Sequence, residues 1–245
     1  MFLDVDQLCV SYPKRANPSV DRVTLGLHAG QMGVLIGSSG CGKTSLLRAV
    51  AGLEQASAGE IRLAQSVVSS ANEHVAPEAR QIGMVFQDFA LFPHLTVLEN
   101  VIFGLREGSI SARKQTGMQW LERVSLQDKA AAYPHELSGG QQQRVAIIRS
   151  LAINPRLLLL DEITSALDPV LVNEVLSIVR DLKQDGMTMV LATHEMGFAT
   201  QVADEVCFLE SGNILERGSA EQVLKNPTNQ KTQEFLKRVH QAGRL

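Results

Sequence analysis

The sequence predicts an α/β protein built on a parallel sheet with helices on both faces. Short, fully apolar runs alternate with stretches of helical periodicity, and a glycine-rich loop follows directly on one apolar run. In such folds the functional residues gather at the carboxyl ends of strands, where Gly37, Asp161 and His194 all fall. A chain of 245 residues can bury a sizeable core but is short for two independent domains, so we expect one compact unit.

The first part of the chain predicts two kinds of strand. Residues 3–10 and 23–28 alternate between apolar and polar side chains, which is typical of half-buried antiparallel strands. Residues 32–36 are more continuously apolar and run straight into Gly37, as expected of a buried strand that feeds a loop. Residues 45–51 then predict a helix.

The middle of the chain, residues 88–150, predicts a mostly helical insertion. Thr96 and Glu99 have the spacing of a capping box, so a helix should begin there. A second helix should cover residues 113–124, and a third should follow Gly140.

After this insertion the alternation of strand and helix returns. Residues 157–160 are a short apolar run that suits a central parallel strand, residues 170–184 predict a helix, and residues 187–192 predict the next strand. We therefore expect residues 1–87 and 151–245 to form the core of a single domain.

Composition argues against several classes of protein. A net charge of −3 offers no basic surface for binding nucleic acid, so we expect no nucleic-acid partner. Cys9, Cys41 and Cys207 are far apart and lack C-x-x-C spacing, which argues against disulfides and structural zinc and favours a reducing compartment. No run approaches the roughly 18 apolar residues that span a bilayer, so any work at a membrane should require a partner.

Residues 37–44 read Gly-Ser-Ser-Gly-Cys-Gly-Lys-Thr and predict a loop that binds the phosphates of ATP or GTP. The glycines let backbone N–H groups approach the phosphates, and the following helix presents its positive end. Lys43 should reach the β- and γ-phosphates, and Thr44 should hold Mg²⁺. A glycine turn with a surface lysine is the alternative, but it would not predict the carboxylate pair found later. The nucleotide-binding candidates here are Gly37, Ser38, Ser39, Gly40, Cys41, Gly42, Lys43, Thr44 and Ser45.

An acidic pair follows the apolar run at residues 157–160. Asp161 could coordinate Mg²⁺ or accept a hydrogen bond from a water bound to it. Glu162 leaves the strand in a different direction and could polarise the attacking water as a general base. Such a pair is often only a helix N-cap, but the upstream phosphate loop favours catalysis.

A second anion-binding element lies at residues 137–144, which read Leu-Ser-Gly-Gly-Gln-Gln-Gln-Arg. A serine and two glycines that open a helix expose N–H donors, and these are redundant if the chain's own loop already holds the nucleotide. A second anion site therefore implies a second subunit, whereas a glycine helix start in a surface loop is the alternative. With these motifs in this order, the sequence resembles the ATP-binding cassette (ABC) ATPases, whose signature motif is Leu-Ser-Gly-Gly-Gln and whose paired copies enclose two ATP molecules head to tail.

The resemblance covers essentially the whole chain and implies a P-loop NTPase of the ABC type. Its RecA-like core would carry an N-terminal antiparallel β subdomain and an inserted helical subdomain. The resemblance implies that Tyr12 stacks on adenine, that Gln87 touches Mg²⁺ and the attacking water, and that His194 contacts the γ-phosphate. Taken alone, such a tyrosine or histidine would more often be structural. The implied catalytic residues are Glu162, His194, Gln87 and Lys43, the Mg²⁺ ligands are Thr44, Gln87 and Asp161, and Ser138, Gly139, Gly140, Gln141 and Asp168 would act across the dimer.

The sequence departs from the family pattern at one position. Proline usually follows the catalytic glutamate, and here Ile163 stands in its place. Proline would bias Glu162 towards an extended backbone, so its absence lifts that restriction and restores an N–H donor. We expect Glu162 to be held less rigidly as a result.

Residues 193–199 and the C-terminal stretch are similar to polar amino acid importers. The resemblance implies an ATP-hydrolysing subunit of a bacterial importer, working as a homodimer with a separate permease and, indirectly, an extracytoplasmic substrate-binding protein. It would be peripheral, at the cytoplasmic face of the inner membrane. An importer of an inorganic ion such as iron is the alternative within the class, and a soluble ABC ATPase acting on DNA or ribosomes, or a structural nucleotide-binding module, lies outside it.

Residues 88–94 are apolar and bear two aromatic side chains. Phe89 and Phe92 could be core residues of the helical part. The resemblance offers another interpretation, in which this stretch forms a groove that receives a short helix of the permease.

Overall fold

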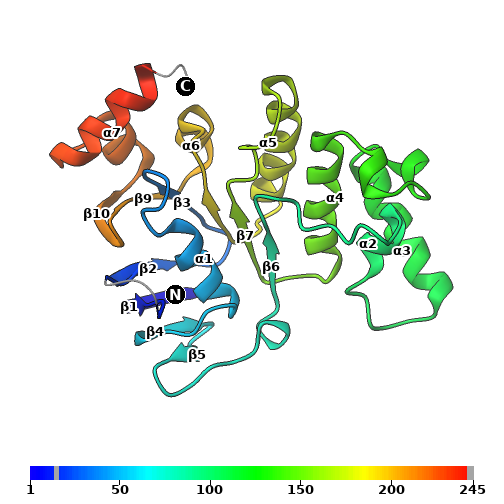
Figure 1. Cartoon of the computed structure of the whole chain (residues 1–245), viewed down its shortest axis with the longest axis horizontal. Helices are drawn as coiled ribbons and strands as arrows, with labels where there is room; N and C mark the ends of the chain where they lie inside the picture. Colours follow the sequence, from blue (N-terminus) through cyan, green and yellow to red (C-terminus); the bar gives the residue numbers. More distant parts are fainter. Residues whose placement is uncertain (14–16, 242–245) are drawn as a thin grey trace.

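Two sheets, with helices between and around them, make up the part of the chain described by the computed structural model, residues 1–13 and 17–241 (Figure 1). The strands and helices alternate along the chain, as the apolar runs predict. Among these residues no helix is long and apolar enough to cross a membrane.

The larger sheet carries the site. Its strand order is β10-β9-β3-β8-β7-β6, and all neighbouring pairs are parallel except the edge pair β10 and β9. Its strands are β3 (Met32–Ile36), β6 (Ile82–Val85), β7 (Leu157–Asp161), β8 (Met189–Ala192), β9 (Glu205–Glu210) and β10 (Asn213–Gly218). Every residue of β3, β7 and β8 is buried, as expected of parallel strands covered on both faces.

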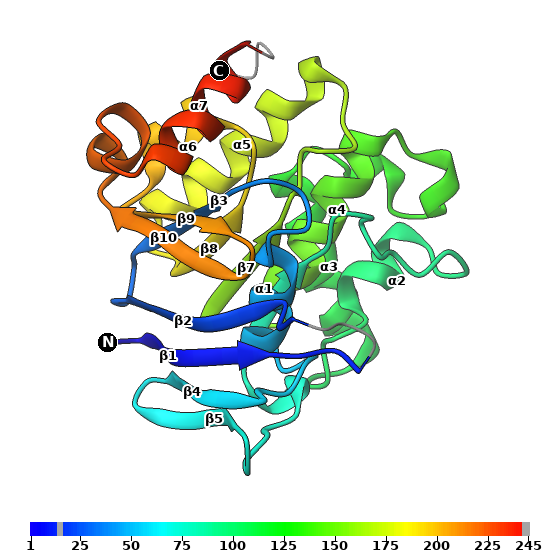
Figure 2. The ribbon, with the colours of Figure 1, turned by 60° about the vertical axis from the view of Figure 1, so that its left-hand side comes forward.

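The smaller sheet is antiparallel and lies across one face of the larger one (Figure 2). Its order is β2-β1-β4-β5, built from β1 (Leu3–Val10), β2 (Val20–Leu27), β4 (Ala58–Leu63) and β5 (Ser66–Ser70). Helix α1 (Lys43–Ala51) lies between the two sheets. One apolar cluster joins all three layers, with Leu8 from the small sheet, Leu46 from α1 and Leu159 from β7.

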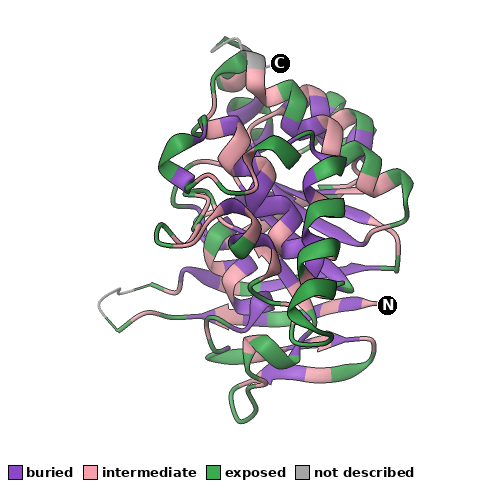
Figure 3. Ribbon diagram, turned by 90° about the vertical axis from the view of Figure 1, so that its right-hand side faces the viewer, coloured by how far each residue is buried: buried purple, intermediate pink, exposed green. Residues whose placement is uncertain are grey.

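Further helices cover the opposite face of the large sheet. These are α4 (Gly139–Ala152), α5 (Pro169–Gln184), α6 (Met196–Val202) and α7 (Gln230–Gln241), and a π-helical segment, Glu221–Lys225, precedes α7. A second cluster fills this side, and the rings of Phe208 on β9 and Phe235 on α7 lie 5.3 Å apart. Figure 3 shows buried residues gathered in the middle of the molecule and exposed ones on the outer faces of the helices.

Helices α2 (Val97–Ile102) and α3 (Ile110–Arg123) pack with α4 on the side of the molecule away from the small sheet (Figure 1). The capping box is confirmed, because Thr96 N–H donates to Glu99 at 2.8 Å and Glu99 N–H donates to the Thr96 hydroxyl at 3.3 Å. Helix α4 contributes Val145 to the apolar cluster of α2 and α3, and Ile147 to the cluster under the large sheet. A division of the chain at residues 88–150 therefore stays a prediction, since one helix belongs to both sides.

The predicted fold class is confirmed, and the predicted strands at residues 3–10 and 32–36 have the predicted bounds. Helix α1 begins earlier than predicted, at Lys43. The sequence analysis did not predict β4, β5, β6, β9, β10, α6 or α7. Strand β6 shows why such elements are missed, because its four residues are too few to display a hydrophobic period.

Candidate nucleotide-binding and catalytic site

The loop between β3 and α1 needs glycine for its backbone. Gly40 and Gly42 have φ angles of 78° and 118°, a region that side-chain-bearing residues rarely occupy. A Cβ on Gly42 would also lie 2.3 Å from the carbonyl oxygen of Ser19. Gly42 is the N-cap of α1 and no side chain caps this end, so the first N–H groups of the helix can face an anion.

Lys43 is folded into the loop and is only 3% exposed. Its ammonium group donates to the carbonyl oxygens of Gly37 at 2.9 Å and Ser38 at 3.3 Å, and lies 3.2 Å from a carboxylate oxygen of Glu162. The lysine charge is therefore placed between the phosphate loop and the acidic pair.

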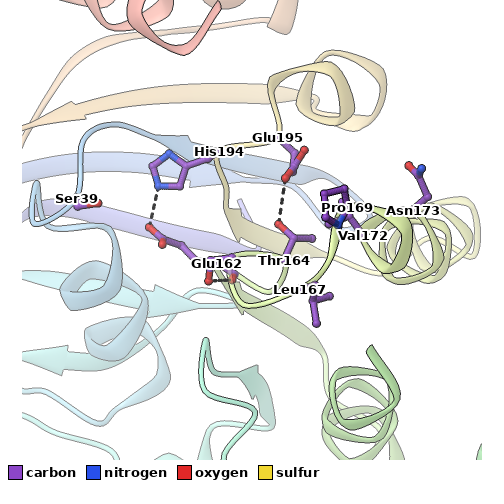
Figure 4. Close-up of a pocket in the computed structure, with 10 residues that line it drawn as sticks. Ser39, Glu162, Thr164, Leu167, Pro169, Val172, Asn173, His194 and Glu195 are labelled. Carbon is purple, nitrogen blue, oxygen red and sulfur yellow. Dashed lines mark hydrogen bonds and ion pairs between the residues drawn. The ribbon is translucent and has the colours of Figure 1, made fainter. Parts of the chain in front are cut away.

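Glu162 joins this lysine to His194. Its Oε1 lies 3.3 Å from Nε2 of His194, and Figure 4 shows the two side chains pointing toward one another. The hydrogen bond from His194, with help from the charge of Lys43, lowers the pKa of Glu162 to about 2 against the opposing effect of burial. The carboxylate is thus ionised at neutral pH, as a general base must be.

The backbone of Glu162 is in the left-handed region, with φ at 47°. Its N–H donates to the carbonyl of Ala192 at 3.0 Å, and its own carbonyl accepts from the N–H and hydroxyl of Ser165 at 3.0 and 2.9 Å. Ile163, which replaces the usual proline, is 2% exposed and packs in the cluster under the sheet. These contacts fix the backbone around Glu162, and the expectation of a looser Glu162 stays a prediction about its motion.

Asp161 and Thr44 lie side by side. Asp161 is 3% exposed, its Oδ1 accepts from the Thr44 hydroxyl at 3.1 Å, and burial raises its pKa. No group of three or more His, Cys, Asp and Glu residues that could hold a metal occurs in the described ranges 1–13 and 17–241. Mg²⁺ is commonly bound by one or two protein oxygens, with phosphates and waters completing its coordination shell. The Asp161 carboxylate and the Thr44 hydroxyl therefore fit that ion.

A cavity of about 590 Å³ opens beside the Glu162–His194 pair (Figure 4). Ser39 of the phosphate loop lines one side, and the residues that lead into α5 line the other. Thr164 and Glu195, hydrogen-bonded at 3.4 Å, line it as well, although the sequence analysis gave them no role. Glu195 follows His194 just after a predicted strand, and this position could have identified it as a site residue. The full lining is Ser39, Glu162, Thr164, Ser165, Leu167, Pro169, Val172, Asn173, His194 and Glu195.

Tyr12 lies near the first turn of α1, since its hydroxyl donates to the Ser45 hydroxyl at 3.3 Å. The ring is half-buried against the cluster between the sheets. Within the loop, Ser38 donates to Glu210 at 3.3 Å, and burial raises the pKa of the Cys41 thiol. The predicted nucleotide-binding residues come from two parts of the chain, residue 12 and residues 37–45. The structure brings both parts to the start of α1.

The signature motif forms the start of α4. Ser138 is its N-cap and makes a capping box with Gln141, at 3.0 and 3.3 Å. A Cβ on Gly140 would lie 3.1 Å from Leu171, so glycine permits close packing of α4 on α5. None of residues 138–141 lines the Glu162 cavity in the part of the chain described. Asp168 lies before α5, and its carbonyl accepts from Leu171 at 2.9 Å.

Gln87 follows β6 and is exposed. In residues 1–13 and 17–241 no hydrogen bond joins it to Thr44, Asp161 or Glu162. Its assignment to Mg²⁺ and the attacking water stays a prediction.

The topology explains why the other candidates meet. Strand β8 lies between β3 and β7, so the phosphate loop after β3, the acidic pair at the end of β7 and His194 after β8 leave the same edge of the sheet. A glycine loop that opens a helix beside a buried carboxylate and a threonine hydroxyl defines a P-loop nucleoside triphosphatase.

Comparison with known proteins narrows this class. Residues 20–165 match the ABC transporter family, and the chain belongs to that family. It is 47% identical over 221 residues to the glutamine transport ATP-binding protein GlnQ of Geobacillus stearothermophilus, which covers 89% of this chain and 91% of that protein. It is 46% identical over 253 residues to the arginine transport ATP-binding protein ArgV of Corynebacterium glutamicum, which covers 96% and 97% respectively.

A solved structure agrees with the sequence relatives. The ATP-binding cassette MJ0796, determined as a dimer in a post-hydrolysis state bound to ADP and Pi, superposes with a TM-score of 0.79 at 29% identity. The match covers 89% of this chain and 98% of that one. The chain is therefore the ATP-binding, ATP-hydrolysing subunit of an ABC transporter.

Proposed function

We propose that this subunit powers the import of polar amino acids through a separate membrane permease, at the cytoplasmic face of the inner membrane. The observation that carries the proposal is the match, over nearly the full length of both chains, to proteins named for glutamine and arginine transport. Relatives at 43% to 44% identity are named for glutamate and cystine transport. Since these substrates differ in charge and size, the similarity supports a class of substrate and not one compound.

We infer that Mg·ATP binds with its phosphates in the loop at residues 37–44 and its adenine against Tyr12. Thr44, Asp161 and Gln87 would hold the ion, which supplies positive charge to the phosphates when bound. Lys43 at present shares its charge between loop carbonyls and Glu162. A triphosphate would compete for that lysine, and Glu162 would then be free to take a proton from water.

In this mechanism Glu162 acts as the base and His194 orients it. The 3.3 Å contact between them supports a histidine that fixes the carboxylate and also faces the γ-phosphate. Since phosphoryl transfer depends mainly on positioning and charge stabilisation, these contacts supply the two effects that the reaction needs.

We propose that the working unit is a homodimer in which each signature motif completes the partner's nucleotide site. Two observations support this arrangement. The start of α4 is separate from the cavity in its own subunit, and its N–H groups suit an anion. The solved cassette that resembles this chain is a dimer. Approach and separation of the two copies would then accompany each round of hydrolysis.

A groove on the helical side supports the association with a permease. It has a volume of about 440 Å³ and a mainly apolar lining. Its residues come from β6 and the segment after it, from α4, and from the ends of α1 and α2. Phe103 is 60% exposed and Ile153 is 43% exposed at its rim. Phe92 also lines it and packs 4.3 Å from Phe103, whereas Phe89 lies against the cluster under the sheet. An exposed apolar groove of this kind suits a short helix of a membrane partner.

The substrate assignment is tested in the assembled transporter. We expect the subunit to co-purify with its permease from membranes, and we expect ATPase activity in proteoliposomes to rise when a polar amino acid and its substrate-binding protein are added. Glutamine, arginine, glutamate and cystine are the compounds to compare. Stimulation by ferric ion and not by any amino acid would contradict the proposal and favour the inorganic-ion alternative.

The proposed role of the groove in binding the permease is tested by placing one charged side chain in it. Phe103→Glu should leave the ATPase activity of the isolated subunit unchanged and abolish substrate-stimulated transport, because a carboxylate would be buried in an apolar contact. Ile110→Glu is the matched control, since Ile110 is 64% exposed and does not line the groove. Loss of basal ATPase in Phe103→Glu would instead indicate a role in the core.

A further inference from the structure

The segment that follows Gln87 has an unusual backbone. Phe89 and Ala90 are consecutive and both are left-handed, with φ angles of 62° and 48°. The N–H of Phe89 donates to the carbonyl of Phe86 at 3.2 Å, and that of Ala90 donates to the carbonyl of Asp88 at 2.7 Å. Among the described residues the other consecutive non-glycine pair with positive φ is Ala64 and Gln65, in the tight turn between β4 and β5. Phe89 and Ala90 do not join two strands of a hairpin, so their strained conformation persists only where the surroundings hold it. We call residues 86–90 the Gln87 turn.

Arg149, on the last turn of α4, supplies such a constraint. Its guanidinium donates to the carbonyl of Ala90 at 2.7 Å and to that of Phe89 at 3.2 Å, and it lies 5.5 Å from the centre of the Phe92 ring. Burial lowers the pKa of this guanidinium. A planar fork of donors matches two adjacent carbonyls, which a lysine ammonium cannot reproduce.

The Gln87 turn also lies near the signature end of the same helix. A Cβ on Gly139 would lie 3.9 Å from the ring of Phe89, so this ring packs near the backbone of the signature motif. Beyond the turn, Asn100 of α2 holds Phe92 through both its backbone groups, at 2.8 and 3.1 Å. The turn is thus fastened to the helical part of the molecule, while β6 before it belongs to the large sheet.

We propose that Arg149 is a positioning residue for Gln87. By fixing the carbonyls of Phe89 and Ala90 it holds the Gln87 turn in its left-handed form, and this form sets where Gln87 stands relative to the nucleotide. The inference rests on the proposed role of Gln87. The same contacts connect the groove to the nucleotide site, because Ala90, Phe92 and Arg149 all line the groove. An occupant of the groove would press on the residues that hold the turn.

The first test separates catalysis from binding. Steady-state ATPase assays of the full chain with Mg·ATP should show that Arg149→Met lowers kcat at least about tenfold and leaves KM for ATP within about twofold, since a misplaced group costs rate and not binding. Arg149→Lys should lose part of this rate. Arg156→Met is the matched control, because Arg156 stacks over Phe2 at 5.1 Å, is exposed and lies outside the site, so its kcat should stay at the wild-type value.

The second test asks whether Arg149 acts through the turn. Ala90→Gly should raise kcat of Arg149→Met several-fold, because glycine adopts a positive φ without strain and so needs the arginine less. Kinetics are measured at a temperature at which both variants are fully folded, so that a gain in stability alone cannot raise kcat. If Arg149→Met does not fold, the same rescue is measured in Arg149→Lys, with circular dichroism and thermal unfolding confirming the fold of each variant.

The third test asks whether Arg149 acts through Gln87. Gln87→Ala should lower kcat. Adding Arg149→Met to Gln87→Ala should lower kcat no further, because both substitutions remove the same contribution, that of a correctly placed Gln87. Additive losses, a kcat of Arg149→Met within twofold of wild type, or no rescue by Ala90→Gly would each overturn the inference. A wild-type kcat for Gln87→Ala would instead contradict the proposed role of Gln87, so the two failures are distinguishable.

Discussion

Glu162 is the residue on which the proposed chemistry depends. Its carboxylate lies 3.3 Å from the His194 ring nitrogen and 3.2 Å from the Lys43 ammonium group. Its backbone is left-handed and is hydrogen-bonded to Ala192 and Ser165. Strain of this kind is found at functional sites, where the surrounding contacts hold the residue in place. The single side chain therefore connects the phosphate loop, the acidic pair and the histidine.

Replacing this base should separate binding from turnover. Glu162→Gln keeps the shape of the side chain but cannot accept a proton at neutral pH, so we expect kcat for ATP hydrolysis to fall by about 100-fold or more, with ATP binding and ATP-dependent dimerisation retained. Phosphate release and size-exclusion chromatography with ATP measure the two properties. Glu54→Gln is the control, because Glu54 pairs with Arg48 on the surface. Turnover near the wild-type rate would remove Glu162 from the role of base.

At the scale of elements, the start and the end of α1 are fixed by different means. At its start, the positive φ angles of Gly40 and Gly42 shape the phosphate loop. At its end, the buried guanidinium of Arg80 donates to the carbonyls of Ala49 and Val50, each at 2.9 Å, and also to Val68 of β5 at 2.8 Å. The helix is thereby held between the two sheets with its N-terminus directed at the nucleotide site.

The two loop glycines should differ in what they tolerate. Gly42→Ala would place a Cβ 2.3 Å from the Ser19 carbonyl in addition to the backbone strain, and we expect it to cost about 3 kcal/mol of unfolding free energy and to abolish ATP binding. Gly40→Ala meets nothing within 4 Å and should cost only the strain of its φ angle, about 1 kcal/mol. Urea unfolding without nucleotide compares the variants. Equal losses would show that the clash at Gly42 relaxes.

Loss of Arg80 should be costly for a reason unrelated to catalysis. Burial lowers its pKa to about 10, so it stays charged at neutral pH and its charge is satisfied by carbonyl oxygens at the end of α1. Arg80→Met would remove the side-chain donor to the Val50 carbonyl and one of the two donors to the Ala49 carbonyl, which also accepts from the N–H of Gly52. We expect a loss of about 3 kcal/mol in urea unfolding. Arg62→Met, which removes a more exposed arginine paired with Glu60, is the control and should cost clearly less than Arg80→Met. A cost for Arg80→Met no larger than that of the control would indicate that water replaces the arginine.

At the scale of the whole molecule, the proposed dimer predicts that two inactive variants can restore activity when they are combined. Lys43→Ala damages the phosphate loop, and Gly139→Asp places a negative charge at the signature helix, where a Cβ meets only ordinary contacts. Each variant alone should be inactive. A mixed dimer of the two would retain one intact composite site, so we expect about half of the wild-type ATPase rate.

Mixed dimers can be isolated by co-expressing the two variants with different affinity tags. Recovery of ATPase activity would support the head-to-tail arrangement. Absence of activity in a mixed dimer that still binds ATP would contradict it, because each subunit would then have to complete its own site. Wild-type subunits carrying the same pair of tags provide the reference rate.

Much of the site could be predicted because its motifs are contiguous in the chain. The phosphate loop, the acidic pair and the signature helix each depend on local backbone geometry. The continuous apolar runs before the phosphate loop and the acidic pair also placed these two motifs at strand ends. The hairpins β4–β5 and β9–β10 were not predicted, although β9 is mostly buried and pairs with β3. Their short lengths and mixed polarity carry too little periodicity, and their pairing depends on partners far away in sequence.

The sequence by itself determined the class of fold, the identity of the phosphate loop and the chemistry available at residues 161, 162 and 194. Only the tertiary structure decided that Glu162 bridges Lys43 and His194, that Thr164 and Glu195 share its cavity, and that Arg149 holds the turn after Gln87. The reason is physical. Motifs report local backbone preferences, whereas these contacts join residues on different strands and helices, whose distances are set by how the two sheets and their helices pack.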